Sequence, residues 1–283
     1  MAASLSLGED SGWMAVAMKY ISIREVEQAI QIMQNRIVDI LCDNRPSIYL
    51  YGSVAVNDFK PGWSDIDILC LTETAPTEKQ ALCLLNLRQE LEAEFNGNKY
   101  FRAFEGGILA LDTFLSGSPG MVVYWGSNGQ RIADSCDFDS FCKAELIDSG
   151  ILLYGNDVRS RLQHPSFSQL RNDIGRRLES VRSHASKTGR TIYSAGWLFD
   201  IARGLYTLRT GKIIAKTSAG EWALENGLCS DIGILETAIK ARKEPGKYKN
   251  DLVFLDWCET LGPYVQRFAD VLERELNRLN KEE

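Results

Sequence analysis

The first part of the chain alternates between helical and strand-like patterns of apolar residues. Apolar positions recur at helical spacing between residues 26 and 41 and again between residues 77 and 95, so both segments are predicted to be amphipathic helices. Ser22 begins a capping-box signature before the first of them. The runs 48–51 and 65–71 lie between the helices and are typical of strands. The residues expected to face inward in the second helix are Leu82, Leu85, Leu91 and Phe95.

Strand-like segments continue after the second helix, at 100–115 and 151–155. The segment 121–126 is open to two interpretations, a further strand or a binding loop. Residues 139–149 are predicted to form a short helix. From about residue 157 the patterns become helical, over 166–185, 193–210, 218–226, 231–243 and 250–280.

These patterns predict an α+β fold class with two domains. We expect a mixed-sheet domain over 21–156 and an all-α helical bundle over 157–283, preceded by a poorly ordered leader over 1–20. A length of 283 residues is compatible with one large domain or two of ordinary size. The first helix of the bundle has an arginine-rich face that we expect to be solvated, formed by Arg171, Arg176, Arg177 and Arg182.

Composition narrows the functional classes. Hydrophobic residues make up 45% of the chain and charged residues 25%, as in soluble globular proteins. The net charge of −6 argues against a general nucleic-acid binder, which usually carries a basic excess. The seven cysteines have no paired spacing, which favours free thiols in a reducing cytoplasm. Because we find neither a basic segment before an apolar N-terminal run nor a long apolar run, we expect a cytoplasmic protein without a membrane span.

The residues with the clearest chemistry lie around residues 48–71. A strand-like run ends at Gly52-Ser53, and glycine lets the backbone approach a ligand closely. A short loop follows, and then Asp65 and Asp67 open the next apolar run. Side chains alternate along a strand, so these two carboxylates project to the same side and repel each other unless a cation lies between them. Mg²⁺ is such a cation, and it usually shares carboxylate ligands with substrate phosphates.

This arrangement resembles the signature of the DNA polymerase beta-like nucleotidyltransferases, in which Gly-Ser is followed after a short loop by Asp-x-Asp. The residues Gly52-Ser53, Lys60-Pro61 and Ser64–Leu69 are most similar to the streptomycin/spectinomycin adenylyltransferase group of aminoglycoside nucleotidyltransferases. The loop is one residue longer than in that group, with Gly62 and Trp63 where one aromatic residue is usual. The structural alternative is a surface turn followed by an exposed strand edge.

The second half of the chain carries the same resemblance. Arg203, the segment 210–216 and the triplet Glu221-Trp222-Ala223 look like the C-terminal helical domain of the same group. The similarity therefore extends from about residue 45 to the end of the chain.

The resemblance implies ATP as co-substrate, Mg²⁺ as cofactor and a set of site residues. Asp65 and Asp67 correspond to the catalytic metal ligands, and Gly52 and Ser53 to donors to the triphosphate. Ser64 is a further donor in this interpretation, and capping the turn before the strand is its alternative role. The residues expected to bind ATP phosphates from the second half are Lys216, Arg203 and Tyr248. Without the resemblance, Lys216 would be an ordinary surface lysine and Arg203 a partner for an acid.

The general base and the acceptor site follow from the same resemblance. The context Arg102-Ala103-Phe104-Glu105 assigns the base to Glu105, which also contacts the substrate, and Asp112 is the fallback. Glu105 as an exposed acid at a strand end is the structural alternative. Trp125 and Asp200 are the other residues expected to bind the acceptor, Trp125 having core packing as its alternative. Residues 183–193 are basic and polar where the group has acids, which leaves acceptors other than streptomycin open.

We therefore expect a transferase that moves AMP from ATP to a hydroxyl of an aminoglycoside or aminocyclitol antibiotic and so confers resistance. Its partners would be ATP and a small cationic acceptor, with no nucleic acid and no membrane, and a monomer is favoured over an oligomer. One alternative is adenylylation of a macromolecule, as in toxin systems. Another is a nucleotide-binding regulator without turnover, which would need no general base.

Overall fold

The computed structural model describes residues 24–95, 97–126, 129–136 and 138–281. The expected leader over 1–20 and the capping signature at Ser22 lie outside the described residues. The chain divides into two compact units. The first contains the described residues up to Asn57 together with Asp65–Phe138 and Leu146–Gln163, and the second contains Asp58–Ser64, Asp139–Glu145 and the described residues from His164 onward.

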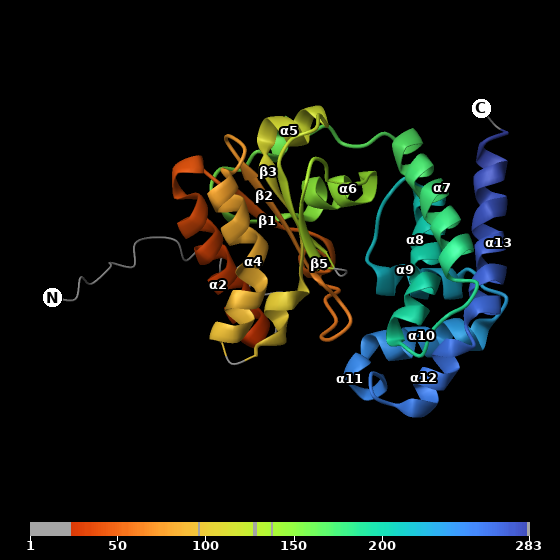
Figure 1. Cartoon of the computed structure of the whole chain (residues 1–283). Coiled ribbons are helices and arrows are strands. Elements are labelled where there is room, and N and C mark those ends of the chain that lie inside the picture. Colours follow the sequence, from red (N-terminus) through yellow and green to blue (C-terminus); the bar gives the residue numbers. More distant parts are fainter. Residues whose placement is uncertain (1–23, 96, 127–128, 137, 282–283) are drawn as a thin grey trace. The chain divides into compact units, whose positions relative to one another are not determined.

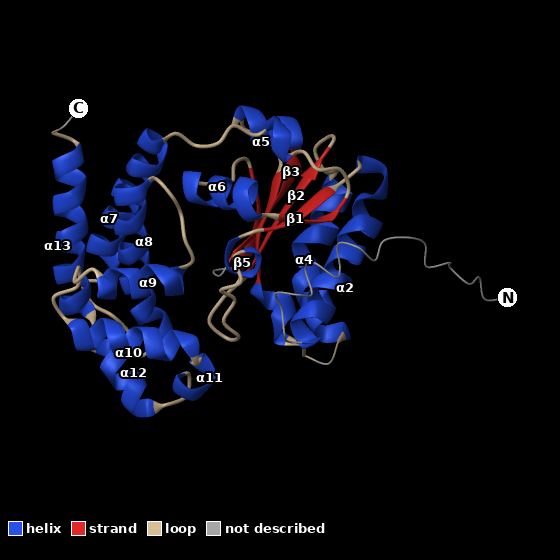
Figure 2. Cartoon of the chain, turned by 180° about the vertical axis from the view of Figure 1, so that it is seen from behind, coloured by secondary structure: helices blue, strands red, loops and turns tan. Residues whose placement is uncertain are grey.

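The first unit is built on a six-stranded sheet with the order β5-β4-β3-β2-β1-β6. Its strands are β1 (Ser47–Leu50), β2 (Ile66–Thr72), β3 (Phe104–Ala110), β4 (Val122–Gly126), β5 (Gly129–Ala133) and β6 (Ile151–Tyr154). β2 and β3 are parallel and every other neighbouring pair is antiparallel. The expected mixed sheet is therefore confirmed, and Figure 2 shows its strands in red.

Two long helices of the first unit, α2 (Arg24–Leu41) and α4 (Glu78–Glu94), lie side by side next to the sheet in Figure 1. α4 begins after Thr77, whose hydroxyl accepts from the Gln80 amide in a capping box. The prediction that Leu82 of α4 faces inward is wrong, because this residue is 55% exposed. The residues of α4 that are buried are Ala81, Leu84, Leu87, Arg88 and Leu91.

The segment expected to be one long strand, 100–115, has three parts. The 3-10 helix Lys99–Ala103 leads into β3, and the chain then turns into the short helix α5 (Leu111–Ser116). The segment 121–126 proves to be a strand, β4, and its partner β5 was not predicted. The predicted short helix and following strand are confirmed as α6 (Ser140–Ser149) and β6.

The second unit is helical over its described residues from His164 onward, as expected. Its helices are α7 (Phe167–His184), α8 (Gly196–Thr210), α9 (Lys216–Glu225), α10 (Ile232–Lys243), α11 (Pro245–Tyr248), α12 (Leu252–Glu259) and α13 (Gly262–Leu279). The pattern 250–280 is thus two helices, because Pro263 occupies the first turn of α13, where a proline needs no amide hydrogen. α7, α8 and α13 pack together around an apolar core (Figure 2). Among the described helices, none is long and apolar enough to cross a membrane.

Candidate active site

The turn after β1 brings backbone against the carboxylate of Asp67. The short helix α3 (Gly52–Ala55) begins there, with Gly52 in the left-handed region at a φ of 62°. The Tyr51 amide donates to the Asp67 carbonyl at 3.1 Å, and this bond holds the turn on the start of β2. A Cβ atom on Gly52 would lie 2.1 Å from Asp67 Oδ2. Glycine is therefore required both by the backbone conformation and by the position of this carboxylate.

The two expected metal ligands and the expected general base lie at the beginning of two adjacent strands, β2 and β3. They are Asp65, Asp67 and Glu105. Asp67 in β2 is paired in register with Glu105 in the parallel strand β3. Such pairs lie about 4.8 Å apart between backbones, so their side chains are neighbours on one sheet face. Asp65 precedes β2 and is two residues before Asp67, and the Ser53 hydroxyl donates to its carbonyl at 3.4 Å. The structure thus brings Asp67 and Glu105 together and holds Asp65 beside the Gly52-Ser53 turn.

This set of acids fits Mg²⁺ better than a metal that needs a complete protein cage. Among the described residues, no group of three or more His, Cys, Asp or Glu side chains is arranged to hold a metal ion. Mg²⁺ usually takes one or two carboxylates and completes its shell with water and substrate phosphates. Asp65 and Asp67 are a pair of this kind, and the absence of a side chain at Gly52 leaves room for the Asp67 carboxylate itself.

The two glycines after Glu105 have a structural cause. Gly106 has a φ of 146°, and a Cβ atom there would lie 1.8 Å from the Ile68 carbonyl oxygen. A Cβ atom on Gly107 would lie 2.9 Å from the Cys136 sulfur. The backbone of β3 therefore approaches its neighbours too closely for the β-branched residues that strands prefer, and Glu105 keeps its place next to β2.

Arg88 is a buried cation behind these acids that the sequence did not reveal. It projects from α4, and its Nη1 donates to the Phe104 carbonyl at 2.7 Å while its Nη2 donates to the Gly126 carbonyl at 3.3 Å. Burial lowers the pKa of Arg88, an effect that the nearby Glu105 carboxylate opposes. Arg88 thus ties the residue before Glu105 to the end of β4. Its position in a helix whose inward face was misassigned left no sequence signal for this role.

Two residues expected at the site have other positions. Asp112 lies in α5, beyond the Ala110 end of β3, and its exposed carboxylate pairs with Arg161. Ala110 is five positions after Glu105, about 17 Å at the usual rise per residue, so Asp112 is at the opposite end of the strand. Trp125 is fully buried and donates its indole N–H to the Leu84 carbonyl at 3.0 Å. The expectation of an acceptor-binding ring at Trp125 is corrected, because the ring packs in the core.

The second unit gathers three basic side chains, each paired with an acid. Lys216 Nζ lies 2.8 Å from Asp200 Oδ1, and Arg203 Nη2 donates to Glu145 at 2.6 Å. The third is Arg177, whose Nε donates to Asp139 at 3.1 Å. We call Lys216, Arg203 and Arg177 the basic cluster.

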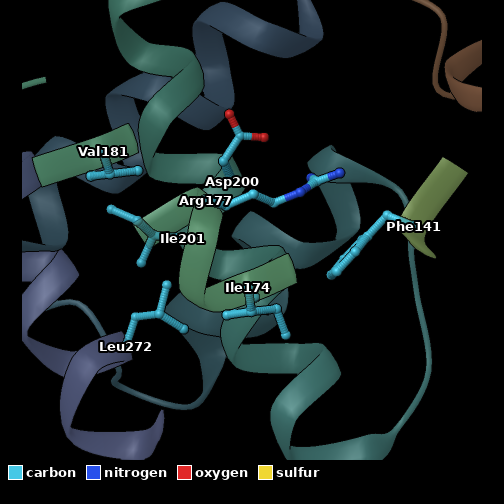
Figure 3. Close-up of a pocket in the computed structure, with 8 residues that line it drawn as sticks. Phe141, Ile174, Arg177, Val181, Asp200, Ile201 and Leu272 are labelled. Atoms are coloured by element: carbon cyan, nitrogen blue, oxygen red, sulfur yellow. The ribbon is translucent and has the colours of Figure 1, made fainter. Parts of the chain in front are cut away.

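The basic cluster surrounds one carboxylate and one aromatic ring. Burial alone would raise the pKa of Asp200, but the charges of Lys216, Arg177 and Arg203 outweigh it and lower the pKa. The guanidinium carbons of Arg177 and Arg203 lie 4.2 and 5.5 Å from the centre of the Phe141 ring. Figure 3 shows Arg177 extending toward Phe141 in a pocket that Asp200 also lines. The helical pattern alone predicts a solvated position for Arg177, because its partners Asp139 and Phe141 lie far away in the sequence.

The remaining expected ligands have structural partners inside the second unit. The Ser64 hydroxyl accepts from the Lys60 amide at 3.0 Å, so it caps the turn before β2. Tyr248 ends α11, and its ring packs edge-on against Phe254 with the ring centres 4.9 Å apart.

Two models of known domains match this chain. Residues 34–103 match the model of the nucleotidyltransferase domain, and residues 167–252 match the model of the aminoglycoside adenylyltransferase C-terminal domain. A search of curated proteins found no match.

A solved structure similar to this chain is the spectinomycin adenyltransferase AAD(9) from Enterococcus faecialis with ATP and spectinomycin. The TM-score is 0.63 at 16% sequence identity, and the match covers 87% of this chain and 98% of that one. At this identity the similarity establishes the fold. The two domain matches, in this order along one chain, identify the protein as a nucleotidyltransferase of the aminoglycoside adenylyltransferase family.

Proposed function

We propose that this protein transfers AMP from ATP, with Mg²⁺, to a hydroxyl of an aminocyclitol or aminoglycoside antibiotic of the spectinomycin and streptomycin type. The observation that carries the proposal is the register pair Asp67 and Glu105, with the carboxylate of Asp67 set against Gly52. Transfer to a hydroxyl requires a metal site for the phosphates and a proton acceptor, and this pair offers one of each on adjacent strands.

Each residue of the first unit has a defined task in this reaction. Asp65 and Asp67 hold Mg²⁺, which supplies charge neutralisation on the phosphates when it is bound. The amides of Gly52-Ser53 donate to phosphate oxygens, and the Ser53 hydroxyl does so in exchange for its bond to the Asp65 carbonyl. Glu105 takes the proton from the hydroxyl of the antibiotic. The hydroxyl oxygen of the antibiotic forms the new bond to the α-phosphorus. The bond from that phosphorus to the bridging oxygen breaks, and pyrophosphate leaves.

The basic cluster of the second unit is the proposed source of phosphate-binding cations. Lys216 and Arg203 now pair with Asp200 and Glu145. Exchange of these carboxylates for phosphate oxygens keeps both cations paired and releases two acids. A released carboxylate at Asp200 suits an ammonium group of the acceptor, because hydrogen bonds between charged groups are stronger than neutral ones. Tyr248 remains a proposed phosphate ligand on resemblance alone.

The acceptor class is supported by the two comparisons together. The C-terminal match is to a domain of aminoglycoside adenylyltransferases, and the structural neighbour binds spectinomycin with ATP. Antibiotic resistance is the proposed consequence of modifying such a molecule.

The proposal is tested by product analysis. The purified protein is incubated with ATP, Mg²⁺ and a panel that includes spectinomycin, streptomycin and other aminocyclitols, and products are identified by mass spectrometry. We expect one acceptor to gain the mass of an AMP group, with pyrophosphate released, and the Asp67→Asn variant to give no product. AMP found only on protein would contradict the small-molecule acceptor and favour a macromolecular one.

A further inference from the structure

The loop between the Gly52-Ser53 turn and β2 carries a buried acid to which the proposed reaction assigns no role. Asp58 is 4% exposed and belongs to the second unit. Its carboxylate accepts from the amide of Thr217 at 3.1 Å and from the hydroxyl of the same residue at 2.5 Å. Arg242 Nη2 donates to it at 3.0 Å, and Lys60 Nζ lies 3.2 Å away. Four donors from three residues therefore converge on one carboxylate.

Arg242 contacts both Asp58 and Thr217, and the side chains of Asp58 and Arg242 are buried. Arg242, which is 3% exposed, also donates from Nε to the Thr217 hydroxyl at 3.1 Å. Its guanidinium carbon lies 5.4 Å from the ring centres of both Trp63 and Phe199. Burial alone would raise the pKa of Asp58, but Arg242 and the hydrogen bonds from Thr217 lower it. The Asp58 carboxylate is therefore ionised and held in place by its hydrogen bonds.

The Asp58 carboxylate contacts the first turn of α9. The residue before the helix, Ala215, has no side chain that can cap it, and Lys216 is the first helical residue. The first amides of a helix lack partners within the helix, and an acid there also interacts favourably with the helix dipole. Asp58 satisfies the amide of Thr217 from a distant part of the sequence, so it replaces the missing cap.

We propose that Asp58, with Arg242 and Thr217, is a positioning group for Lys216. Because Thr217 follows Lys216 directly, fixing its amide and hydroxyl fixes the backbone from which the lysine projects. The loop that follows the phosphate-binding turn thereby sets the direction of a cation in the second unit. This inference rests on the proposed function, in which Lys216 binds the ATP phosphates.

The test is a double-mutant cycle on nucleotide affinity. Calorimetry with Mg²⁺ and a non-hydrolysable ATP analogue gives the dissociation constant for the wild type, Asp58→Asn, Lys216→Ala and the double variant. We expect Asp58→Asn to weaken binding about three- to thirty-fold, the range typical of coupled residues in one network. In the Lys216→Ala background, Asp58→Asn should change the affinity by less than about twofold, because the group it positions is gone.

Two further variants separate positioning from stability. Asp173 is a comparably buried acid of the second unit that accepts from the Ser140 amide at 2.7 Å, so Asp173→Asn should lower the melting temperature without changing the dissociation constant. Thr217→Val removes one hydroxyl and keeps the side-chain shape, and it covers the case in which Asp58→Asn does not fold. We expect Thr217→Val to weaken analogue binding and Thr217→Ser to restore it.

The outcomes distinguish this inference from the function beneath it. Two outcomes would overturn the positioning role alone. In the first, Asp58→Asn weakens binding equally in the wild type and in the Lys216→Ala background. In the second, Lys216→Ala weakens binding but Asp58→Asn and Thr217→Val do not. Unchanged affinity in Lys216→Ala would overturn the phosphate role of Lys216 and this inference with it. Product formation by the wild-type protein decides separately whether the proposed reaction stands.

Discussion

At Gly52 the missing side chain leaves the space that the carboxylate of Asp67 occupies. Gly117 provides a comparison, because its φ of 65° is almost the same as the 62° of Gly52, yet a Cβ atom there would meet nothing within 4 Å. The two positions therefore separate the cost of a left-handed backbone from the cost of displacing an acid.

Gly52→Ala should slow the reaction, and Gly117→Ala should not. Gly117→Ala should lose roughly 1–2 kcal/mol of folding free energy, the usual cost of a side chain in this region, and Gly52→Ala should lose at least as much. Only Gly52→Ala should also lower kcat/KM, by about 10²-fold, because it displaces Asp67. Thermal unfolding and steady-state kinetics on both variants check this. Equal activity in the two variants would show that the close approach of the Asp67 carboxylate to Gly52 has no catalytic role.

Glu105→Gln should bind MgATP normally and lose chemistry by about 10²–10⁴-fold, the usual contribution of a general base. Single-turnover kinetics, with calorimetry for ATP binding, give the two quantities. Asp112→Asn is the matched control and should keep full activity, because Asp112 lies at the other end of β3. An inactive Asp112→Asn beside an active Glu105→Gln would move the base to Asp112.

At the scale of elements, sequence patterns located most helices and strands but not all of their faces and ends. α4 has leucines on more than one side, so Leu82 fitted an apolar stripe although it is exposed. The helix Leu111–Ser116 continues the apolar run of β3 without a break, and no period separates the two. β5 is a partly exposed edge strand with the sequence Gly-Gln-Arg-Ile-Ala, so it lacks the apolar run that marks a buried strand.

The stability that the contact between Asp173 in α7 and Ser140 at the start of α6 contributes should depend on pH. Asp173 in α7 accepts from the Ser140 amide and pairs with Arg176. Burial alone would raise the pKa of Asp173, but these partners lower it. Its stabilising contribution is therefore complete above the unfolded pKa of about 3.9 and is lost as the pH falls through the lower folded value.

Thermal unfolding of the wild type and Asp173→Asn from pH 7 to pH 3 checks this. At pH 7 the variant should be less stable by about 1–3 kcal/mol, as expected for a lost hydrogen bond to a charged group. The gap should narrow as the pH falls below about 3.9. A gap that is constant over the whole range would contradict ionisation of Asp173 as its cause.

At the scale of the whole molecule, the two compact units are not two consecutive pieces of sequence. The segments Asp58–Ser64 and Asp139–Glu145 interrupt the first unit and pack with the second. A composition change near residue 157 cannot reveal this, because the partners of Asp58 and Phe141 lie far along the chain in α7 to α10. The motif residues Asp65 and Asp67 were predictable from local spacing, whereas the partners of Lys216 and Arg203 were not.

A fragment that ends at residue 163 should therefore be inactive and poorly folded. It would carry the segment with Trp63 and the segment with Phe141 without the helices that bury them, and exposed apolar surface favours aggregation. Solubility, circular dichroism and thermal unfolding of the fragment check this. A monomeric fragment with a cooperative transition like that of the full chain would contradict the described division.

The central claim is that the phosphorus transferred to the acceptor is the α-phosphorus of ATP, at the site formed by Asp65, Asp67 and Glu105. The most direct measurement uses ATP labelled at either the α or the γ phosphate, with Mg²⁺ and an acceptor identified in the panel. The α label should move to the acceptor, the γ label should leave as pyrophosphate, and Asp67→Asn should transfer neither. Appearance of the γ label on the acceptor, or undiminished transfer by Asp67→Asn, would contradict this claim.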